Sequence, residues 1–281
     1  EPRFLQSRFV LYMHENQLTY PVSDKDSDLI ENRDKHYGFM NYTSCLVADH
    51  VAFNSEYHRT SFINGLNKFS SQLPDRLDIQ SIIDKSSIIF SILDVELFHP
   101  AQNQNKLSKT ILWNHRWEYD KRPDVFFEAM IHLKNKGIDF KLILLGRMND
   151  TVLKLYSNQL ASLKPQIHHL GFAPTKDDYY RLLSLSDIVV STSIHDFFGI
   201  SVLEGIYAGC RPLLPYDLAY PELVPTELHD RVFYKRNNLL PALENVLSEK
   251  WSSENQKRTR VYIEMRFVWE HVEQKYETVL G

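Results

Sequence analysis

Short apolar segments alternate with helical patterns along the whole 281-residue chain, and this alternation restricts the possible folds more than any other feature. The segments are rich in Val, Ile and Leu, which is typical of strands buried on both faces of a parallel sheet. Strands separated by helices join into parallel sheets with helices on both sides. We therefore predict an α/β fold with strands at 8–13, 50–54, 86–91, 110–113, 140–146, 167–171 and 187–192.

Several helices have recognisable ends. A helix is predicted to begin at Pro123 and to end before Gly137, since proline suits a first turn and glycine the position after the last. Thr175 with Asp178 predicts a capping box at the start of another helix. Residues 266–280 form an amphipathic helical pattern that is expected to pack on a neighbouring surface. Membrane binding is the weaker alternative, because the opposite helix face is mostly acidic.

A polar segment interrupts the alternation at residues 99–109, "HPAQNQNKLSK", and its lack of periodicity predicts a linker. It separates a first α/β domain at 1–106, which has few strands, from a second at 107–260. The last part, 261–281, is predicted to be a helix that packs back toward the first domain.

Composition excludes some classes of function. The formal net charge of −4 argues against a general nucleic-acid-binding protein. Residues 231–266 nevertheless hold eight Lys or Arg and four Glu. A solvated helix face explains this local excess better than a patch for a polyanionic acceptor, which remains the alternative. The chain has no apolar run of about 18 residues, so no membrane span is predicted.

The two cysteines, Cys45 and Cys210, are far apart in the sequence and in apolar surroundings. Buried thiols in a reducing compartment are the favoured interpretation, and a disulfide is the alternative. The favoured interpretation predicts a cytoplasmic protein.

Ligands of parallel α/β sheets bind beyond the carboxyl ends of the strands. Gly146, Gly171 and Gly199 follow three of the predicted strands and so direct attention to those loops. The sequence contains neither a G-x-G-x-x-G fingerprint nor a Walker loop, which disfavours dehydrogenases and P-loop enzymes. The adjacent His168 and His169 point to opposite sides of a strand. No metal site is predicted.

The loop after the strand at 110–113 carries two cations, Arg116 and Lys121, just before the helix that begins at Pro123. Cations beside free amides at a helix N-terminus suit a diphosphate. The alternative is an exposed loop with ordinary charges, and on this loop alone that alternative is favoured.

The segment "HDFFGISVLEG" at 195–205 places Asp196 before a helix and Glu204 one turn inside it. Gly199 allows the chain to turn tightly and to approach a ligand closely. Both carboxylates can then line one pocket with backbone N–H groups, an arrangement that suits sugar and ribose hydroxyls. The alternative is a helix with Asp196 as its cap and Glu204 as a satisfied interior acid.

Together these two motifs resemble those of the retaining glycosyltransferases of the GT-B fold, family 4. That family pairs an Arg and a Lys with a later Glu-x7-Glu around a Gly-Phe-Gly turn; here Asp196 and Phe197 replace the first Glu and the first Gly. The resemblance covers nearly the whole chain. Within the family, the chain is most similar to the tRNA-queuosine mannosyltransferase subgroup and its bacterial relatives, through "MHENQLTYP", "SCLVADHVAFNS", "WNHRWEYDK", "PTKDDYY" and "HDFFGISVLEGIYAGC".

The resemblance implies two Rossmann-like domains that face a cleft, with an acceptor-side N-terminal domain that lacks its first βαβ units. It also implies roles for individual residues. Glu204 is expected to hold the ribose, and Arg116 and Lys121 the diphosphate. Asp196 and the amides of Phe198, Gly199 and Ile200 are expected to hold the sugar. The turn at Gly171, Phe172 and Ala173 is expected to pass the nucleobase, and His14 to face the reacting sugar.

The activity that the resemblance implies is hexosyl transfer with retention, from GDP-mannose to queuosine in tRNA. The nucleotide-sugar is a substrate, and no metal or other cofactor is expected. One alternative is a glycosyltransferase that acts on a lipid or polysaccharide. The other is a non-catalytic module that binds nucleotide-sugars. The sequence gives no prediction of oligomeric state.

Overall fold

The computed structural model describes residues 7–21, 34–101, 107 and 109–281. The chain divides into two compact units. One comprises residues 1–91 together with 270–281, and the other comprises residues 92–269. In the described part of the chain, every pairing between strands is parallel, as the alternating sequence pattern predicted.

The N-terminal unit contains a sheet of three strands in the order β1-β2-β3 among its described residues. Met13, Val51 and Phe53 pack with helices on one face of this sheet. Ala52 and Ile89 belong to the core on the other face. The strands are β1 (Val10–Met13), β2 (His50–Phe53) and β3 (Ser86–Ile88), and the helices are α2 (Asp34–Val47), α3 (Glu56–Ser70) and α4 (Gln80–Asp84).

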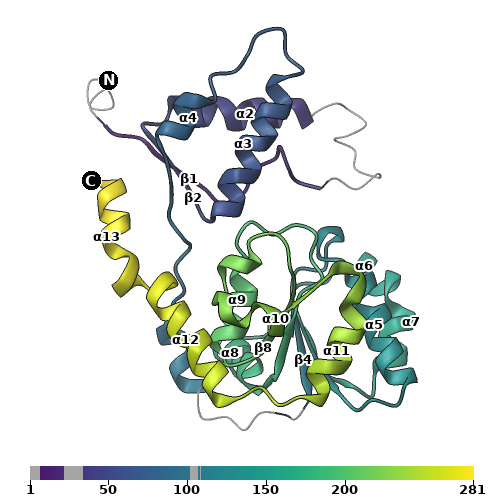
Figure 1. Cartoon of the computed structure of the whole chain (residues 1–281). Coiled ribbons are helices and arrows are strands. Elements are labelled where there is room, and N and C mark those ends of the chain that lie inside the picture. Colours follow the sequence, from purple (N-terminus) through teal and green to yellow (C-terminus); the bar gives the residue numbers. More distant parts are fainter. Residues whose placement is uncertain (1–6, 22–33, 102–106, 108) are drawn as a thin grey trace. The chain divides into compact units, whose positions relative to one another are not determined.

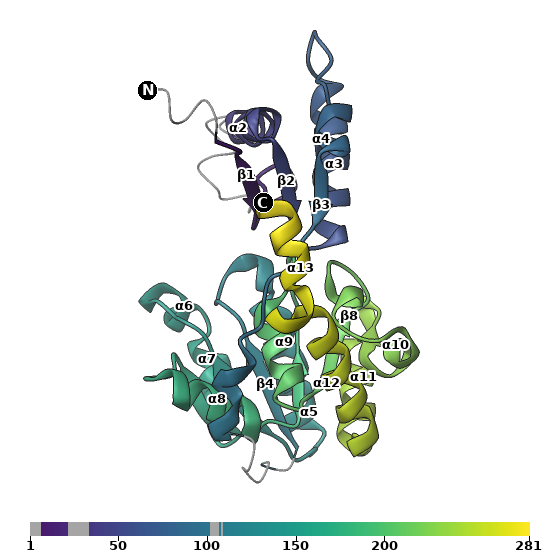
Figure 2. The same cartoon turned by 90° about the vertical axis from the view of Figure 1, so that its left-hand side faces the viewer.

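Helix α13 (Trp269–Leu280) covers the second face of this sheet, beside β1 and β2 in Figure 2. Val279 is buried in the core with Ala52 and Ile89. The Tyr276 hydroxyl donates to the carbonyl oxygen of Phe90 at 2.7 Å. The C-terminal segment therefore completes the core of the N-terminal unit.

The predicted continuous helix over 266–280 is interrupted. α12 (Ser253–Phe267) ends one residue before Val268, which is extended at φ −101° and ψ 144°. The carbonyl oxygen of Phe267 accepts a hydrogen bond from the Leu93 N–H at 2.7 Å. Phe267 and Val268 are both buried. The extended Val268 thus ends α12, and both apolar side chains at this break are buried.

The C-terminal unit begins at Ile92, earlier than the predicted boundary between residues 106 and 107. The 3-10 helix η2 (Val95–Ala101) carries Phe98, which is almost fully buried. Its ring centroid lies 4.5 Å from that of Tyr180 and 4.9 Å from that of Tyr207. This aromatic contact attaches the segment to the C-terminal unit. Much of the predicted linker at 99–109 (residues 102–106 and 108) lies outside the described residues.

The sheet of the C-terminal unit has six described strands in the order β6-β5-β4-β7-β8-β9. Two of them were missed from the sequence, β8 and β9. β8 is fully buried but contains Pro212 and Pro215. It was missed because proline usually marks an edge strand or a loop. The strands are β4 (Thr110–Asn114), β5 (Lys141–Leu145), β6 (Ile167–Gly171), β7 (Ile188–Val190), β8 (Arg211–Pro215) and β9 (Phe233–Tyr234).

Helices cover both faces of this sheet (Figure 1). α8 and α9 lie on one side of it, and α5 and α11 lie on the other. Ile111, Trp113 and Leu144 face the second group of helices. Gly205 of α9 lies directly against Val189 and Leu112 on the first face. The helices are α5 (Pro123–Asn135), α6 (Asp150–Leu155), α7 (Ser157–Leu163), α8 (Lys176–Leu185), α9 (Ile200–Tyr207), α10 (His229–Val232) and α11 (Leu239–Ser248).

Gly146, directly after β5, lies in close contact with His115, which follows β4. Its φ is +115°, and a Cβ added there would lie 2.0 Å from the His115 carbonyl oxygen. Gly146→Ala is therefore expected to lower the free energy of unfolding by more than about 3 kcal/mol. Gly137→Ala is the control, because Gly137 also has a positive φ but open space around it, so about 1–2 kcal/mol is expected. Urea unfolding measures both variants, and equal losses would contradict the close contact.

Candidate functional site

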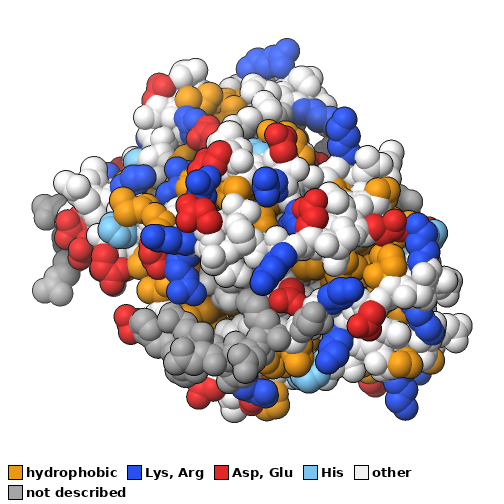
Figure 3. Space-filling model, turned by 60° about the horizontal axis from the view of Figure 1, so that its bottom comes forward, with side chains coloured by type: hydrophobic (Ala, Val, Ile, Leu, Met, Phe, Trp, Pro, Cys, Tyr) orange, Lys and Arg blue, Asp and Glu red, His pale blue; other side chains and the backbone are white. Residues whose placement is uncertain are grey.

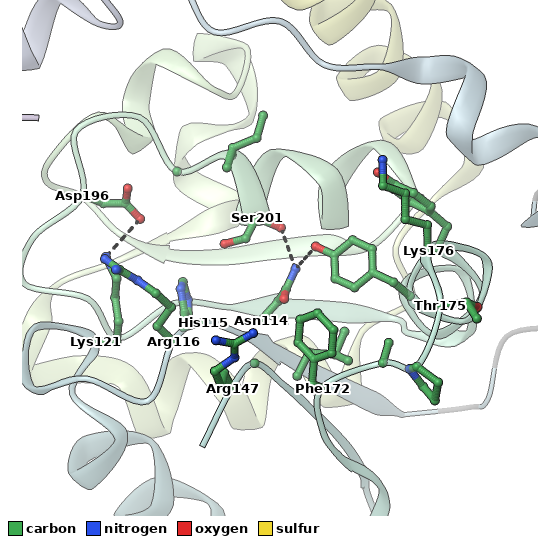
Figure 4. A pocket seen from close by; sticks show the side chains of 18 residues that line it. Asn114, His115, Arg116, Lys121, Arg147, Phe172, Thr175, Lys176, Asp196 and Ser201 are labelled. Atoms are coloured by element: carbon green, nitrogen blue, oxygen red, sulfur yellow. Dashed lines mark hydrogen bonds and ion pairs between the residues drawn. The ribbon is translucent and has the colours of Figure 1, made fainter. Parts of the chain in front are cut away.

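A cavity of about 870 Å³ lies at the carboxyl ends of the central strands of the C-terminal unit. Asn114 ends β4, Gly146 follows β5, Phe172 follows β6, and Asp196 lies in the loop after β7. The strand order reverses between β4 and β7, and such reversal points are where open α/β sheets bind ligands. The volume suits a ligand of several linked groups. Figure 4 shows the side chains that line the cavity.

The loop after β4 contributes the two predicted cations. Arg116 lines the cavity with a largely exposed side chain and lies 3.3 Å from the Glu118 carboxylate. Lys121 is buried. Its Nζ donates to the His195 carbonyl oxygen at 2.7 Å and lies 3.7 Å from Asp196 Oδ2. Lys121 is thus fixed in the cavity wall, whereas the exposed Arg116 side chain is held by its ion pair with Glu118.

His115, next to Arg116 in the sequence, is a buried residue of the cavity lining. Burial, together with the smaller effect of the Lys121 cation, lowers the pKa of His115 from its ordinary 6.5 to about 3. Its Nε2 is buried without a hydrogen-bond partner among the described residues. The imidazole is therefore neutral near pH 7 and adds no charge to the site.

This depressed pKa predicts a pH dependence of stability. In the unfolded chain His115 takes up a proton below pH 6.5, whereas the folded chain resists it until about pH 3. Its contribution to stability is complete above pH 6.5 and is lost as the pH falls. Between pH 6.5 and 5 the loss should be about 2 kcal/mol. The difference in free energy of unfolding between wild type and His115→Gln should shrink by that amount, measured by urea unfolding.

The control for this measurement is His168→Gln, because the His168 side chain is exposed. Its difference from wild type should stay constant over the same pH range. If His115→Gln also shows a constant difference, the neutral buried imidazole is the wrong description.

Asp196 is held by contacts other than those of a helix cap. α9 begins after Gly199, and no side chain caps its first turn. Asp196 Oδ2 instead accepts from the Tyr220 hydroxyl at 3.1 Å. A Cβ on Gly199 would lie 2.9 Å from the same Tyr220 ring, which explains the glycine at φ +87°. Tyr220 and Lys121 therefore fix the carboxylate at the edge of the cavity, and the capping alternative is wrong.

Glu204 reaches the cavity through a tyrosine. The Tyr179 hydroxyl donates to Glu204 Oε2 and accepts from Asn114 Nδ2 at 2.6 Å. Asn114 also donates to the Ser201 carbonyl oxygen at 3.2 Å. Burial raises the pKa of Glu204, and hydrogen bonds from Tyr179 and Tyr180 oppose this effect. Part of the interior-acid alternative is therefore correct, since Glu204 already has partners beside the cavity.

The structure brings together most of the residues that were predicted to bind the nucleotide-sugar. Gly171 ends β6 at φ +105° next to the lining, and Phe198 is buried 5.6 Å from the Phe267 ring. His14 follows β1 in the N-terminal unit, where its ring lies 4.7 Å from that of Tyr12. Its role toward a reacting sugar stays a prediction. The predicted residues that line the cavity are Arg116, Lys121, Phe172, Ala173, Asp196, Gly199 and Ile200.

The residues of the site that were missed from the sequence include Asn114, Arg147, Tyr179 and Tyr220. Asn114 and Arg147 lie at the ends of β4 and β5, so the rule that ligands bind beyond strand ends could have found them. Tyr179 and Tyr220 are far from the acids in sequence, and only the folded chain shows their contacts.

Several other predictions bear on function. Cys45 and Cys210 are buried thiols, as predicted. No group of three His, Cys, Asp or Glu residues close enough to hold a metal occurs among the described residues. No helix in the described part of the chain is long and apolar enough to cross a membrane.

Several of the cations at 231–266 have partners within the protein. Arg258 pairs with Glu254 at 3.0 Å, and Arg236 pairs with Asp217 at 2.8 Å. Arg260 donates to the Tyr207 carbonyl oxygen at 3.2 Å. On the face drawn in Figure 3, basic and acidic side chains are interspersed. These contacts favour the solvated-surface interpretation.

Comparisons with known proteins agree with this geometry. Residues 94–259 match the family model "Glycosyl transferases group 1", and residues 2–92 match "tRNA-queuosine alpha-mannosyltransferase N-terminal". The chain is 31% identical over 238 residues to the tRNA-queuosine alpha-mannosyltransferase of Drosophila melanogaster. That alignment covers 80% of this chain and 62% of the fly protein, so the chain spans less than two thirds of this relative.

Solved structures share the fold at low identity. Anabaena HepE in complex with UDP and glucose has a TM-score of 0.72 and 15% identity, over 99% of this chain and 72% of that one. Sucrose-phosphate synthase from Thermosynechococcus elongatus has a TM-score of 0.73 and 15% identity, over 99% and 68%. These likenesses show the GT-B fold. The family model that spans the cavity-bearing unit identifies the chain as a member of the glycosyl transferases group 1 family.

Proposed function

We propose that this protein transfers mannose from GDP-mannose, with retention at the anomeric carbon, to queuosine in tRNA. The observation that carries the donor assignment is the arrangement of the cavity. Two cations, Arg116 and Lys121, line the cavity after β4. Asp196, held by Tyr220, also lines it, and Glu204 is held by the lining residue Tyr179. This pattern matches a diphosphate flanked by hydroxyl-bearing groups, because cations bind its oxygens and carboxylates accept from hydroxyls.

Each group then has a distinct task. Arg116 and Lys121 bind the diphosphate and stabilise the negative charge that grows on it as the glycosidic bond breaks. Asp196, fixed by Tyr220, accepts hydrogen bonds from hexose hydroxyls, and the backbone N–H groups of Phe198, Gly199 and Ile200 donate to hexose oxygens. Glu204, oriented by Tyr179, accepts from the ribose. The loop cations supply the charge, so we propose a reaction that needs no resident metal and is unaffected by EDTA.

The proposed step exchanges one bond for another at a single carbon. The bond between the anomeric carbon and the leaving phosphate oxygen breaks, and the acceptor oxygen forms its bond on the same face. The acceptor proton passes to the leaving phosphate oxygen. Among the described residues that line the cavity, Asp196 is the only one with a carboxylate, whereas retaining glycosidases require two carboxyl groups about 5–5.5 Å apart. A front-face route is therefore preferred.

The acceptor assignment rests on the N-terminal unit. Residues 2–92 match the N-terminal family model of tRNA-queuosine alpha-mannosyltransferase, and the fly relative carries the same description. We propose that this unit binds the acceptor tRNA in the cytoplasm and that His14 contributes to the reacting sugar's site.

The test is transfer of radiolabelled mannose from GDP-mannose to purified tRNA. We expect labelling of tRNA that contains queuosine and none of the same tRNA with unmodified guanosine at that position. Anomeric analysis of the released nucleoside should show the α configuration of the donor. Transfer to lipid or polysaccharide alone would replace the acceptor assignment. Donor binding without transfer to any acceptor would identify a non-catalytic module and contradict the proposal.

A further inference from the structure

One end of the donor cavity carries an exposed aromatic ring beside a free guanidinium. Phe172, after β6, is 69% exposed, although large apolar side chains are usually buried. Arg147, after β5, lies with its guanidinium carbon 5.9 Å from the Phe172 ring centroid. Both residues line the cavity, and Figure 4 shows them next to each other. Arg147 forms no hydrogen bond or ion pair with any described residue.

The order of the strands places this pair at a particular end of the ligand. Phe172 and Arg147 follow β6 and β5, the cations Arg116 and Lys121 follow β4, and Asp196 follows β7. From β6 to β7 the ends cover three strand spacings, or roughly 14 Å. If the cations bind the diphosphate and Asp196 the sugar, as proposed above, the nucleobase must lie on the other side of the cations. That side is the one with Phe172 and Arg147.

The chemistry of the pair distinguishes between bases. An arginine fork only donates hydrogen bonds, and its two parallel N–H groups need two neighbouring acceptors. Guanine offers O6 and N7 side by side, whereas adenine pairs its N7 acceptor with an amino donor. Uracil lacks a second acceptor next to its O4. An exposed phenylalanine ring adds a stacking surface, on which a purine buries more area than a pyrimidine.

We propose that Arg147 and Phe172 select guanine as the base of the donor. The Arg147 guanidinium binds O6 and N7, and the Phe172 ring stacks on the base. This inference rests on the proposed donor site. At 5.9 Å the guanidinium is near the outer limit of a cation–π contact, so it is free to turn toward a ligand.

The test is calorimetric titration of the whole chain with GDP, ADP and UDP. Wild type should bind GDP about 5- to 150-fold more tightly than either competitor. Arg147→Met should remove most of this preference, because it should weaken the binding of GDP. The affinity for UDP should stay within about twofold of wild type, since the cations that bind the diphosphate remain. Phe172→Leu should weaken GDP and ADP more than UDP. Arg181→Met is the control, because it removes a cation of α8 that lies outside the cavity lining. It should leave the affinities for all three nucleotides unchanged.

Two analogues isolate the proposed edge of the base. Inosine diphosphate keeps O6 and N7 and should bind wild type like GDP. 7-Deaza-GDP lacks N7, so it should bind wild type more weakly than GDP but bind Arg147→Met as GDP does. Equal losses for GDP and UDP in Arg147→Met would make Arg147 a phosphate ligand and overturn the inference. A wild-type preference for UDP or ADP would overturn it while leaving a donor site. Binding of no nucleotide would overturn the donor site as well.

Discussion

The Arg116→Met variant is expected to lose about 100-fold or more in kcat, as when one preorganised donor to a developing oxyanion is removed. The Arg116 side chain faces the cavity and has a single ion pair, with Glu118. Bound donor diphosphate would replace that weak surface contact with a charge-assisted, desolvated one. Because negative charge on the diphosphate grows in the transition state, the loss should fall on kcat more than on donor KM.

Arg122→Met is the matched control, since Arg122 lies in the same loop but pairs with Asp124 outside the cavity lining. It should retain wild-type kcat. Both variants should keep a wild-type melting temperature, because both side chains reach solvent. A loss confined to KM would show that Arg116 binds the donor equally in the ground and transition states. No loss at all would remove Arg116 from the site.

The Glu204→Gln variant is expected to bind the donor about 10- to 100-fold more weakly, because hydrogen bonds from ribose hydroxyls to a carboxylate exceed those to an amide. Its kcat should change little, since the ribose contact is the same before and during bond cleavage. Burial raises the pKa of Glu204, which means that the folded state disfavours its charge. The neutral amide should therefore leave the melting temperature unchanged or raise it.

Glu264→Gln provides the comparison for this variant. Glu264 also accepts a hydrogen bond from a tyrosine, Tyr207, at 3.2 Å, but it does not line the cavity. The Glu264→Gln variant should leave the affinity for the nucleotide-sugar unchanged. Equal affinities of the two variants for donor would contradict the ribose role of Glu204. A large fall in melting temperature only in Glu204→Gln would point instead to a structural acid held by Tyr179.

The fold was largely predictable because the strands of a doubly covered sheet are short apolar runs that no surface constraint interrupts. β4 and β5 follow this rule closely, with little polar character in their interiors. β8 escaped because Pro212 and Pro215 lie in a strand with buried neighbours on both sides. The break at Val268 was not predicted, because the hydrogen bond from Leu93 to Phe267 at this break joins residues far apart in sequence.

The site was predictable where a motif lies on one continuous loop. Arg116, Lys121 and Asp196 each follow a strand end, and the parallel sheet brings those ends together. The tyrosines that orient the acids were not predictable. Tyr179 lies 25 residues before Glu204, and Tyr220 lies 24 residues after Asp196. Their hydroxyls meet the carboxylates only because α8, α9 and the segment after β8 pack around the same cavity.

The central claim is that this cavity binds a nucleoside diphosphate sugar. Its most direct test is titration of the chain with GDP-mannose, followed by calorimetry. The account predicts saturable binding at one site per chain. Affinity should fall in Glu204→Gln and remain at the wild-type value in Glu264→Gln. Absence of binding by GDP-mannose, and equally by UDP- and ADP-sugars titrated in parallel, would contradict the account.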